Sequence, residues 1–338
     1  MRRTRRGPSR RRDWLRFLTV LSSAGVVTVW AAGEFIGERH WLTTLLAYIP
    51  QHPFLFPAAL LSVGSLALRR PGLAAVNGLV LLFGAFYLLG FSVGRQETGA
   101  RADLRVMTYN IHHGAMGVDR IAADIRQQQP DVVLLQEANA YRSWTDPVPP
   151  LATLLPDYHV FTIGDEVALL SRLPVSQAQS WRLRRNGARR KGLDATVKVG
   201  KKRLRILNVH LMTSATGSSL ARSKAQAPTH LRHTAEARSE QFEEMRRWVE
   251  RQRDPFIVAG DFNTPPRGVL YRRLPGWGLT DSFSAAGFGF GATYRSDLPV
   301  LRIDHIFTGP GVRALRTWVP PTRSSDHRPV VADLTLDD

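Results

Sequence analysis

Three long apolar stretches near the start of the chain restrict its fold most strongly. They cover Phe17–Gly33, Trp41–Leu68 and Pro71–Gly94, and none of them contains Lys, Arg, Asp or Glu. A helix of about 20 such residues crosses the roughly 30 Å hydrocarbon core of a bilayer. We therefore predict an all-α transmembrane region over residues 14–94, with about three helices in contact with the lipid bilayer.

The middle stretch is less regular than the other two. Pro50, Pro53 and Pro57 interrupt it, and the part from Phe54 to Leu68 is short for a span on its own. It is interpreted as a kinked span preceded by an interfacial segment. A cleaved signal peptide is the alternative for the first stretch, although the apolar segments that follow argue against it.

Positive charge is distributed unevenly around these stretches. Eight Arg and one Asp lie within residues 2–16, and an Arg-Arg pair at residues 69–70 separates the second stretch from the third. The segment at residues 38–40, between the first two stretches, is nearly balanced. The positive-inside rule then places the basic N-terminus, residues 1–13, in the cytoplasm. Three spans would deliver the rest of the chain to the outer face, which predicts a multi-pass protein of the cell membrane with an extracytoplasmic domain.

The rest of the chain has the pattern of a mixed α/β domain. Residues 95–103 are polar and contain Gly, so we interpret them as a linker before a domain that covers residues 104–338. Two segments, Asp119–Gln129 and His230–Arg253, have helical periodicity. Short apolar runs predict strands; they are Leu104–Ile111, Val132–Leu135, Val167–Leu170, Ala195–Val199, Leu204–Val209, Phe256–Ala259, Leu301–Phe307 and Val330–Leu334. This content predicts an α/β fold, a two-sheet β-sandwich flanked by helices.

Charge and composition restrict the classes of partner and of chemistry. Residues 101–338 hold 34 Lys and Arg against 24 Asp and Glu, a formal charge of +10 within the +18 of the whole chain. A basic surface of this size suits an anionic partner such as nucleic acid, lipid headgroups or phosphate esters, or serves solubility alone. Arg189 and Arg190 lie in a strongly basic segment and are candidate phosphate-binding residues; a solvated hairpin tip is the alternative. The absence of Cys excludes disulfides and thiolate chemistry.

Polar side chains stand where several predicted strands end or begin. The run "IVAGDFN" places Asp261 and Asn263 after an apolar strand, although an unpaired Asp there must be hydrated, hydrogen-bonded or bound to a cation. Similar runs are "MTYNIHHG", "VVLLQE", "LNVHL", "RIDHIF" and "SSDHRPV". Their polar residues are Asn110, Glu137, His210, Asp304, Asp326 and His327. If the strands bring them to one edge, they form a site of oxygen ligands and imidazoles, as a Mg²⁺-dependent phosphoryl reaction requires.

Taken in this order, the motifs make the chain from Leu104 to Leu334 resemble the endonuclease/exonuclease/phosphatase superfamily. That superfamily includes deoxyribonuclease I, the exonuclease III-like apurinic endonucleases, the neutral sphingomyelinases and the inositol polyphosphate 5-phosphatases. The resemblance extends to "ALLSRLPV", to Arg238 and Gln241 in "RSEQF", and to "TYRSDLP". It implies a deoxyribonuclease I-like fold with the site at one edge of the sandwich. It also implies a phosphoric ester hydrolase that uses Mg²⁺, or Mn²⁺ in its place.

The resemblance implies a metal site as well. Glu137, with Asn110 nearby, would hold the divalent metal, because Mg²⁺ takes one or two carboxylates and keeps several waters. Asp326 would be a second metal ligand or an alternative base, and the sequence does not separate these roles. His112 stands where some relatives have a metal-site carboxylate, so the number of metal ions stays open.

The remaining site residues would act on phosphate and water. Asp261 would orient or deprotonate the attacking water, while Asn263 hydrogen-bonds a phosphate oxygen. His327 would stabilise the negative charge that develops on the phosphate, with Asp304 holding its ring in one tautomer. His210 matches the second active-site histidine of the nuclease and sphingomyelinase branches, and it would also contact the substrate.

The predicted function is that of a membrane-anchored, divalent-metal-dependent phosphoesterase, which hydrolyses a phosphate ester or anhydride by metal-assisted attack of water. The N-terminal stretches also resemble those of bacterial teicoplanin-resistance membrane proteins, whose implied substrates are polyprenyl-linked pyrophosphates. A tethered site faces lipid headgroups at high effective concentration, which favours a lipid-linked phosphate. The alternatives are an extracytoplasmic Mg²⁺-dependent endonuclease or exonuclease acting on nucleic acid, and a non-catalytic binding module. No protein partner is predicted.

Overall fold

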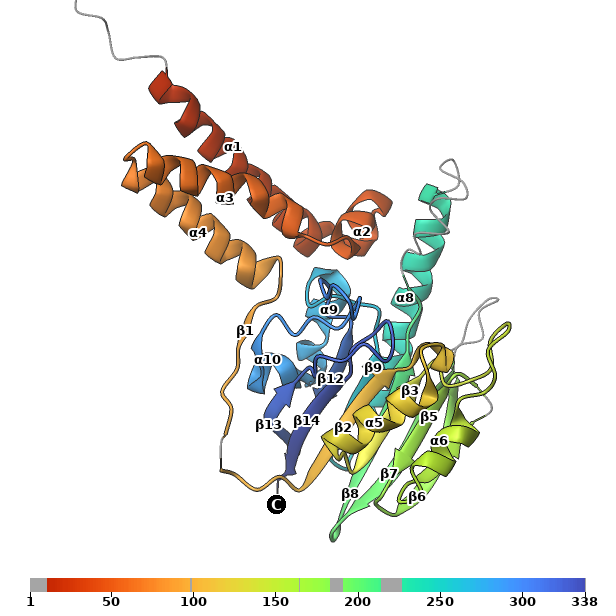
Figure 1. The fold of residues 1–338 in the computed structure, drawn as a ribbon. Helices are drawn as coiled ribbons and strands as arrows, with labels where there is room; N and C mark the ends of the chain where they lie inside the picture. The colour runs from red at the N-terminus through yellow and green to blue at the C-terminus, as the bar shows by residue number, and fades with distance from the viewer. Residues whose placement is uncertain (1–10, 98, 164, 183–190, 214–226, 338) are drawn as a thin grey trace, which may run out of the picture.

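The computed structural model describes residues 11–97, 99–163, 165–182, 191–213 and 227–337. A group of N-terminal helices leads away from a β-sandwich that the rest of the chain forms (Figure 1). The predicted phosphate-binding residues Arg189 and Arg190 lie outside the described residues.

The N-terminal apolar stretches form helices, and the middle stretch forms two of them. Helix α1 continues through a π-helical turn, η1, and a 3₁₀ turn, η2. The middle stretch divides into a short helix, α2, and a longer one, α3, because Pro50 lies in the break and Pro53 in the first turn of α3. The bounds are α1 (Arg11–Ala31), η1 (Ala32–Ile36), η2 (Gly37–Arg39), α2 (Trp41–Tyr48), α3 (His52–Ala67) and α4 (Pro71–Tyr87).

Most of the large hydrophobic side chains that the described residues expose belong to these helices. Phe17, Val20, Phe56, Leu60 and Leu79 are each more than half exposed, although they lie in strongly apolar segments. By length and composition, the helical segment from residue 14 to residue 39 can cross a membrane. Helices α3 and α4 have 16 and 17 residues, so each is about 25 Å long and falls short of a full hydrocarbon core.

The sandwich consists of two six-stranded mixed sheets. The first has the order β10 (Thr280–Asp281), β12 (Asp304–Thr308), β9 (Phe256–Asp261), β8 (Lys202–His210), β7 (Lys191–Val199) and β6 (Val175–Arg182). The second has the order β13 (Val312–Trp318), β14 (Val330–Leu336), β2 (Leu104–Asn110), β3 (Val132–Gln136), β5 (Val167–Ser171) and β4 (His159–Thr162). In each sheet one central pair is parallel, β8 with β9 and β2 with β3. Two short strands, β1 (Ser92–Val93) and β11 (Phe288–Gly289), pair separately.

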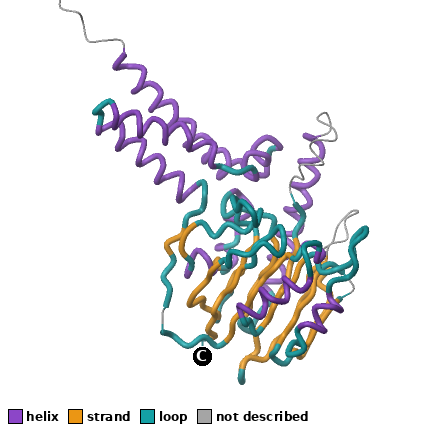
Figure 2. Tube along the Cα trace, viewed as in Figure 1, coloured by secondary structure: helices purple, strands orange, loops and turns teal. Residues whose placement is uncertain are grey.

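Helices cover the outer faces of both sheets, as Figure 2 shows. Apolar side chains of α5 (Val118–Gln128) and α6 (Val148–Leu154) pack on the second sheet, and those of α8 (Ala227–Glu250) and α9 (Gly268–Arg273) pack on the first. The central core lies between the sheets and includes Val106, Leu134, Ile206, Ala259 and Ile306. The short elements η3 (His112–Gly114), η4 (Pro275–Trp277) and α10 (Ser282–Ala286) lie in connections. This arrangement confirms the predicted α/β fold class.

Every strand predicted from an apolar run is present, and three longer strands were not predicted. These are β4 and β13, at the two edges of the second sheet, and β6, at one edge of the first. An outermost strand buries only part of its surface and therefore carries polar residues, as in the alternating burial of β13. A continuous apolar run consequently identifies inner strands and misses these edge strands.

The segment predicted to be a linker, residues 95–103, lies along the surface of the sandwich. Its backbone N–H groups at Arg95, Glu97 and Asp103 donate to carbonyl oxygens of the sandwich at distances of 2.8, 2.9 and 2.9 Å.

Arg267, just after β9, connects the sandwich to the N-terminal helices. Its buried guanidinium donates to the carbonyl oxygens of Ala47, Ile49 and Leu88, at 2.8, 3.1 and 2.7 Å. Carbonyls at helix ends lack partners within the helix, so this cation caps two helices at once.

Candidate active site

Three predicted site residues lie side by side on neighbouring strands of the first sheet. His210 is the last residue of β8 and is paired with Asp261, the last residue of β9. Asp261 is paired in turn with Asp304, the first residue of β12. Side chains alternate between the faces of a strand, so these three continue the inward-facing series that includes Ile206, Ala259 and Ile306. The site is therefore the polar end of the core between the sheets.

The second sheet contributes residues to the same end. Asn110 is the last residue of β2, and Glu137 follows β3 directly. The side-chain amide of Asn110 donates to Asp261 Oδ2 at 3.0 Å and to Glu137 Oε1 at 3.2 Å. Asn110 thus connects carboxylates that the two sheets supply separately.

A buried polar layer separates this site from the apolar core. Gln136 donates from Nε2 to Asn208 Oδ1 at 2.7 Å and to Thr108 Oγ1 at 3.0 Å. Asn208 donates to the carbonyl oxygens of Leu135 and Ala168, both at 3.0 Å. Buried polar groups that are fully hydrogen-bonded make the packing specific, so this layer fixes the relative position of the two sheets beneath the site.

His327 lies in the loop before β14 and pairs with Asp304. Its Nδ1 is 2.8 Å from Asp304 Oδ2, and its Nε2 is 3.9 Å from Asp261 Oδ2. Burial of the ring favours the neutral form, but the charges of Asp304, Asp261 and Asp326 outweigh it and raise the pKa of His327 to about 10. The ring is therefore protonated at neutral pH.

His210 is buried between carboxylates. Its Nε2 lies 3.8 Å from Glu137 Oε1 and 3.6 Å from Asp261 Oδ2. On its other side, Nδ1 lies 3.3 Å from Glu166 Oε1. Glu166 precedes β5 and was not predicted as a site residue. It occupies the same kind of position as Glu137, directly beside a buried apolar strand, and that signal could have identified it.

Tyr294 is a second residue that the sequence analysis did not assign to the site. Its ring centroid is 4.8 Å from that of His327. Burial raises the pKa of its hydroxyl, and the charges of Asp326, Asp261 and Glu137 raise it further. Asp326 lies at the same site, because its neighbour Ser325 donates from Oγ to the carbonyl oxygen of Asn110 at 2.8 Å and its own Oδ1 lies 3.6 Å from Nδ1 of His112. The signal for Tyr294 in the sequence is the run "TYRSDLP", which contributes to the family resemblance.

The loops at the site adopt unusual backbone conformations. Glu137, Asn263, His112 and His113 all have positive φ, between 46° and 53°, in a region that residues other than Gly seldom occupy. His112 Nδ1 lies 3.6 Å from Asp326 Oδ1, and His113 Nε2 lies 3.2 Å from Glu137 Oε2. Such strain concentrates at functional sites because the surrounding structure must hold it in place.

Asn263 is anchored at both ends. Its backbone N–H donates to Asp261 Oδ1 at 2.8 Å, and its side-chain amide donates to the carbonyl oxygen of Leu211 at 3.0 Å. The NH₂ group carries two hydrogens, and within the described part of the chain the second one has no partner and can serve a ligand. The structure thus brings together Asn110, Glu137, His210, Asp261, Asn263, Asp304, Asp326 and His327.

The donor set at this site fits a divalent cation. Asp304 Oδ1 is buried and has no hydrogen-bond partner among the described residues, so a carboxylate oxygen is left uncompensated. Ligand atoms of Asp261, Asp304 and His327 lie within 4.8 Å of one another. Nδ1 of His327 is already paired with Asp304, so a metal could reach this ring only at Nε2 and only after displacing a proton. Glu137, with a side chain 23% exposed, is the better ligand for an ion that keeps several waters.

The sequence and the fold both match known proteins. Residues 107–327 match the model of the endonuclease/exonuclease/phosphatase family. The protein YbhP of Escherichia coli K12 is 24% identical over 268 residues, which cover 69% of this chain and 96% of YbhP.

Solved structures share the sandwich. An endonuclease/exonuclease/phosphatase from Beutenbergia cavernae DSM 12333 is 25% identical, with a TM-score of 0.55 over 70% of this chain and 72% of that one. The mannosyl-6-phosphatase Bt3783 of Bacteroides thetaiotaomicron VPI-5482 is 19% identical, with a TM-score of 0.55 over 69% of this chain and all of that one, and it shows the common fold. Because the family match extends over more than half of the sequence, the chain belongs to the endonuclease/exonuclease/phosphatase family.

Proposed function

We propose that this chain is a membrane-anchored, divalent-metal-dependent phosphoesterase, with a lipid-linked phosphate ester or anhydride as its substrate. The observation that carries the proposal is the bridge that Asn110 makes between Asp261 and Glu137, because it concentrates acidic groups from both sheets at one point. Members of the family act as phosphoesterases or nucleases and generally use divalent metals. Both activities are hydrolysis of a phosphate-containing substrate, which is the coarser function that the family membership supports.

We place the metal at Glu137, with Asn110 and Asp326 as further ligands. The amide nitrogen of Asn110 faces the carboxylates, while its oxygen accepts from the His112 N–H at 3.1 Å, so ligation by Asn110 requires its amide to turn over. When bound, Mg²⁺ or Mn²⁺ supplies positive charge to phosphate oxygens and lowers the pKa of a coordinated water. Glu137 and Asp326 are partly exposed, as an ion that retains waters requires.

The remaining residues bind and orient the reactants in this proposal. Asp261 Oδ1 accepts from the backbone N–H of Asn263, and Oδ2 accepts from the Asn110 amide. When that amide turns over to bind the metal, Oδ2 is released to orient the attacking water and to accept its proton. His327 donates from Nε2 to a phosphate oxygen, and Asp304 keeps its ring protonated and aligned. His210 and the free amide hydrogen of Asn263 hold other phosphate oxygens.

Membrane anchorage is supported by the N-terminal helices. The segment from residue 14 to residue 39 has the length and composition of a span, and side chains of α3 and α4 such as Phe56, Leu60 and Leu79 are exposed. An active site tethered beside a bilayer meets lipid-linked phosphate at high effective concentration. We keep the multi-pass topology with an extracytoplasmic domain as part of the proposal. A reporter fused after Asp338 tests it, and activity of the cytoplasmic form of the reporter would contradict it.

A substrate panel tests the function directly. The purified full-length chain would be assayed with Mg²⁺ against polyprenyl pyrophosphate, sphingomyelin, inositol phosphates and plasmid DNA, with and without EDTA. We expect EDTA-sensitive hydrolysis that is fastest on a lipid-linked phosphate. Cleavage of DNA without hydrolysis of any lipid would favour the nuclease alternative, and full activity in EDTA would exclude the metal mechanism.

A further inference from the structure

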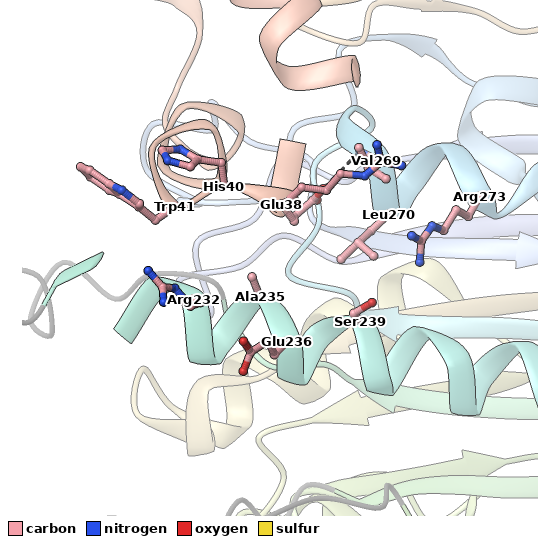
Figure 3. A pocket seen from close by; sticks show the side chains of 11 residues that line it. Glu38, His40, Trp41, Arg232, Ala235, Glu236, Ser239, Val269, Leu270 and Arg273 are labelled. Atoms are coloured by element: carbon pink, nitrogen blue, oxygen red, sulfur yellow. Dashed lines mark hydrogen bonds between the residues drawn. The ribbon is translucent and has the colours of Figure 1, made fainter. Parts of the chain in front are cut away.

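A cavity of about 610 Å³ lies where the N-terminal helices meet α8 and α9 (Figure 3). Residues 38–41 form one wall, α8 forms the opposite wall, and α9 closes one end. None of the predicted site residues that the structure describes lines this cavity. It is therefore separate from the candidate active site, although α9 follows the catalytic strand β9 by only a few residues.

The cavity lies where the candidate span ends. Glu38 and Arg39 line the cavity, and the apolar helical segment from residue 14 finishes at Arg39. Ile36 and Leu42, on either side, are 45% and 53% exposed. An apolar exposed surface thus borders directly on charged groups, which is the polarity change that a protein meets at the headgroup level of a bilayer.

Basic side chains outnumber acidic ones at the cavity, with three Arg against two Glu. Arg39 and Arg232 are exposed and make no ion pair among the described residues, and Arg273 is only loosely paired, at 3.9 Å from a carboxylate. Two acidic groups, Glu38 and Glu236, also line the cavity. Glu38 accepts from the Tyr48 hydroxyl at 3.0 Å and from the Val269 N–H at 3.2 Å, while Glu236 is exposed on α8. Figure 3 shows Arg232 and Arg273 at opposite ends of the cavity. Guanidinium groups bind phosphate oxygens through two N–H donors at once, which a single point cation cannot do.

Apolar side chains complete the lining. Trp41 lies across the cavity from α8, and Ala235, Val269 and Leu270 contribute further apolar surface. Trp is enriched at membrane interfaces because its ring is apolar and its N–H is polar. A ligand with a phosphate group and an attached apolar chain would satisfy both kinds of surface.

We propose that this cavity binds the phosphate headgroup of an anionic phospholipid, as an accessory site distinct from the phosphoesterase site. The inference rests on the membrane anchorage in the proposed function. Arg39, Arg232 and Arg273 contact the headgroup, and Trp41 contacts the start of the acyl region. Because the N-terminal helices, α8 and α9 all line the cavity, a lipid bound there contacts each of them and fixes the orientation of the sandwich against the bilayer.

The test measures lipid retention by the full-length chain. The protein would be reconstituted in nanodiscs of phosphatidylcholine with or without phosphatidylglycerol, then transferred to detergent, and the retained lipids would be counted by native mass spectrometry. We expect selective retention of phosphatidylglycerol. Replacing both Arg232 and Arg273 by Gln should weaken that retention about tenfold or more, since each basic group near an anionic surface contributes a several-fold effect. Arg253→Gln, an exposed Arg past the end of α8, is the matched control and should retain lipid normally.

A second variant covers the case in which the double change prevents folding. Ser239→Trp would place a large side chain in the cavity and leave every basic group in place, so it should weaken retention by excluding part of the lipid. Equal retention of both lipids by the wild type, or undiminished retention by these variants, would overturn the proposal. Displacement of phosphatidylglycerol by inorganic phosphate at low concentration would also overturn it, because the ligand would then be a soluble anion.

The outcomes also distinguish this inference from the proposed function. If alkaline carbonate extracts the wild-type chain from membranes, the proposed membrane anchorage is wrong, and so is this inference. If the chain resists carbonate but retains both lipids equally, only the proposed lipid site is wrong. The panel of phosphate substrates tests the chemistry independently of either result.

Discussion

Nδ1 of His327 lies 2.8 Å from Oδ2 of Asp304, and both side chains are buried at the edge of the sandwich. The pair connects β12 of the first sheet to the loop that leads into β14 of the second. Its geometry allows the ring to donate to the carboxylate on one side and to present a second N–H toward Asp261 on the other.

Removal of this ring should reduce turnover more than binding. A donor that meets charge developing in the transition state contributes about 10² to 10³ in rate. His327→Ala should therefore lower kcat by that order and leave KM nearly unchanged, as steady-state kinetics on the best substrate of the panel would show. Unchanged kcat on every substrate would exclude the histidine from the mechanism.

The pH dependence of activity should report the charge of His327. The ring is protonated below its raised pKa of about 10, so its contribution is complete at neutral pH and is lost as the pH rises through that value. Asp304→Asn removes the carboxylate charge that raises the pKa, and the alkaline limb of kcat/KM should move to lower pH. Asp254→Asn, at an exposed ion pair, is the control. An alkaline limb that stays in place in Asp304→Asn would contradict the assignment.

Metal affinity should depend on Glu137. Glu137→Gln keeps the size of the side chain but removes a charge, so the concentration of Mg²⁺ that gives half-maximal activity should rise about tenfold or more. Titration calorimetry with Mn²⁺ would measure the same loss without a substrate. The melting temperature should stay close to that of the wild type, because the Glu137 side chain is partly exposed. Equal Mn²⁺ affinity in both proteins would place the metal elsewhere.

Gly260 allows β8 and β9 to approach closely beside the site. Its φ is 142°, and a Cβ at this position would overlap the carbonyl oxygen of Val209. Gly260→Ala should therefore displace Asp261 and reduce the free energy of unfolding by at least about 2 kcal/mol. Gly276→Ala has open space around the added carbon and should change stability little. Thermal melting of both variants in detergent would compare them, and equal melting temperatures would refute the steric argument.

A buried ion pair under the first sheet should give acid-dependent stability. Burial of Asp281 favours its neutral form, but Arg302, His305 and Tyr271 outweigh this and lower the pKa of Asp281 well below its usual range. The pair thus stabilises the fold above the unfolded-state pKa of about 3.9, and this contribution is lost as the pH falls through the lower folded-state value. In this pair, Oδ2 of Asp281 lies 2.6 Å from Nη1 of Arg302.

Arg302→Met should therefore cost about 3–5 kcal/mol at neutral pH, because it leaves a buried charge without its partner. The difference from the wild type should shrink below about pH 4, where Asp281 becomes protonated in the variant. Arg295→Met breaks an exposed pair and should cost about 1 kcal/mol or less. A difference between Arg302→Met and the wild type that is constant with pH would show that packing, rather than charge, is responsible.

Local sequence patterns were sufficient for the inner part of the fold and for most of the candidate site. The inner strands are recognisable because both of their faces are buried, which requires continuous apolar runs. Asp261, Asp304 and His210 are recognisable because each interrupts such a run at its end. The pattern failed at β4, β6 and β13, because an edge strand satisfies its environment with polar residues.

Contacts between distant segments were decided only by the tertiary structure. Glu166 beside His210 and Tyr294 beside His327 have only weak local signals, a Glu next to an apolar strand and the run "TYRSDLP", and neither signal places the residue at the site. Arg267 resembles any surface Arg in the sequence, but it is buried and caps two N-terminal helices. The sequence by itself determined which residues have the chemistry for phosphate and metal, since side-chain type and strand period are local properties. Their partners, and the cavity between the helices and the sandwich, required the folded chain, because only packing brings together groups that are far apart in the sequence.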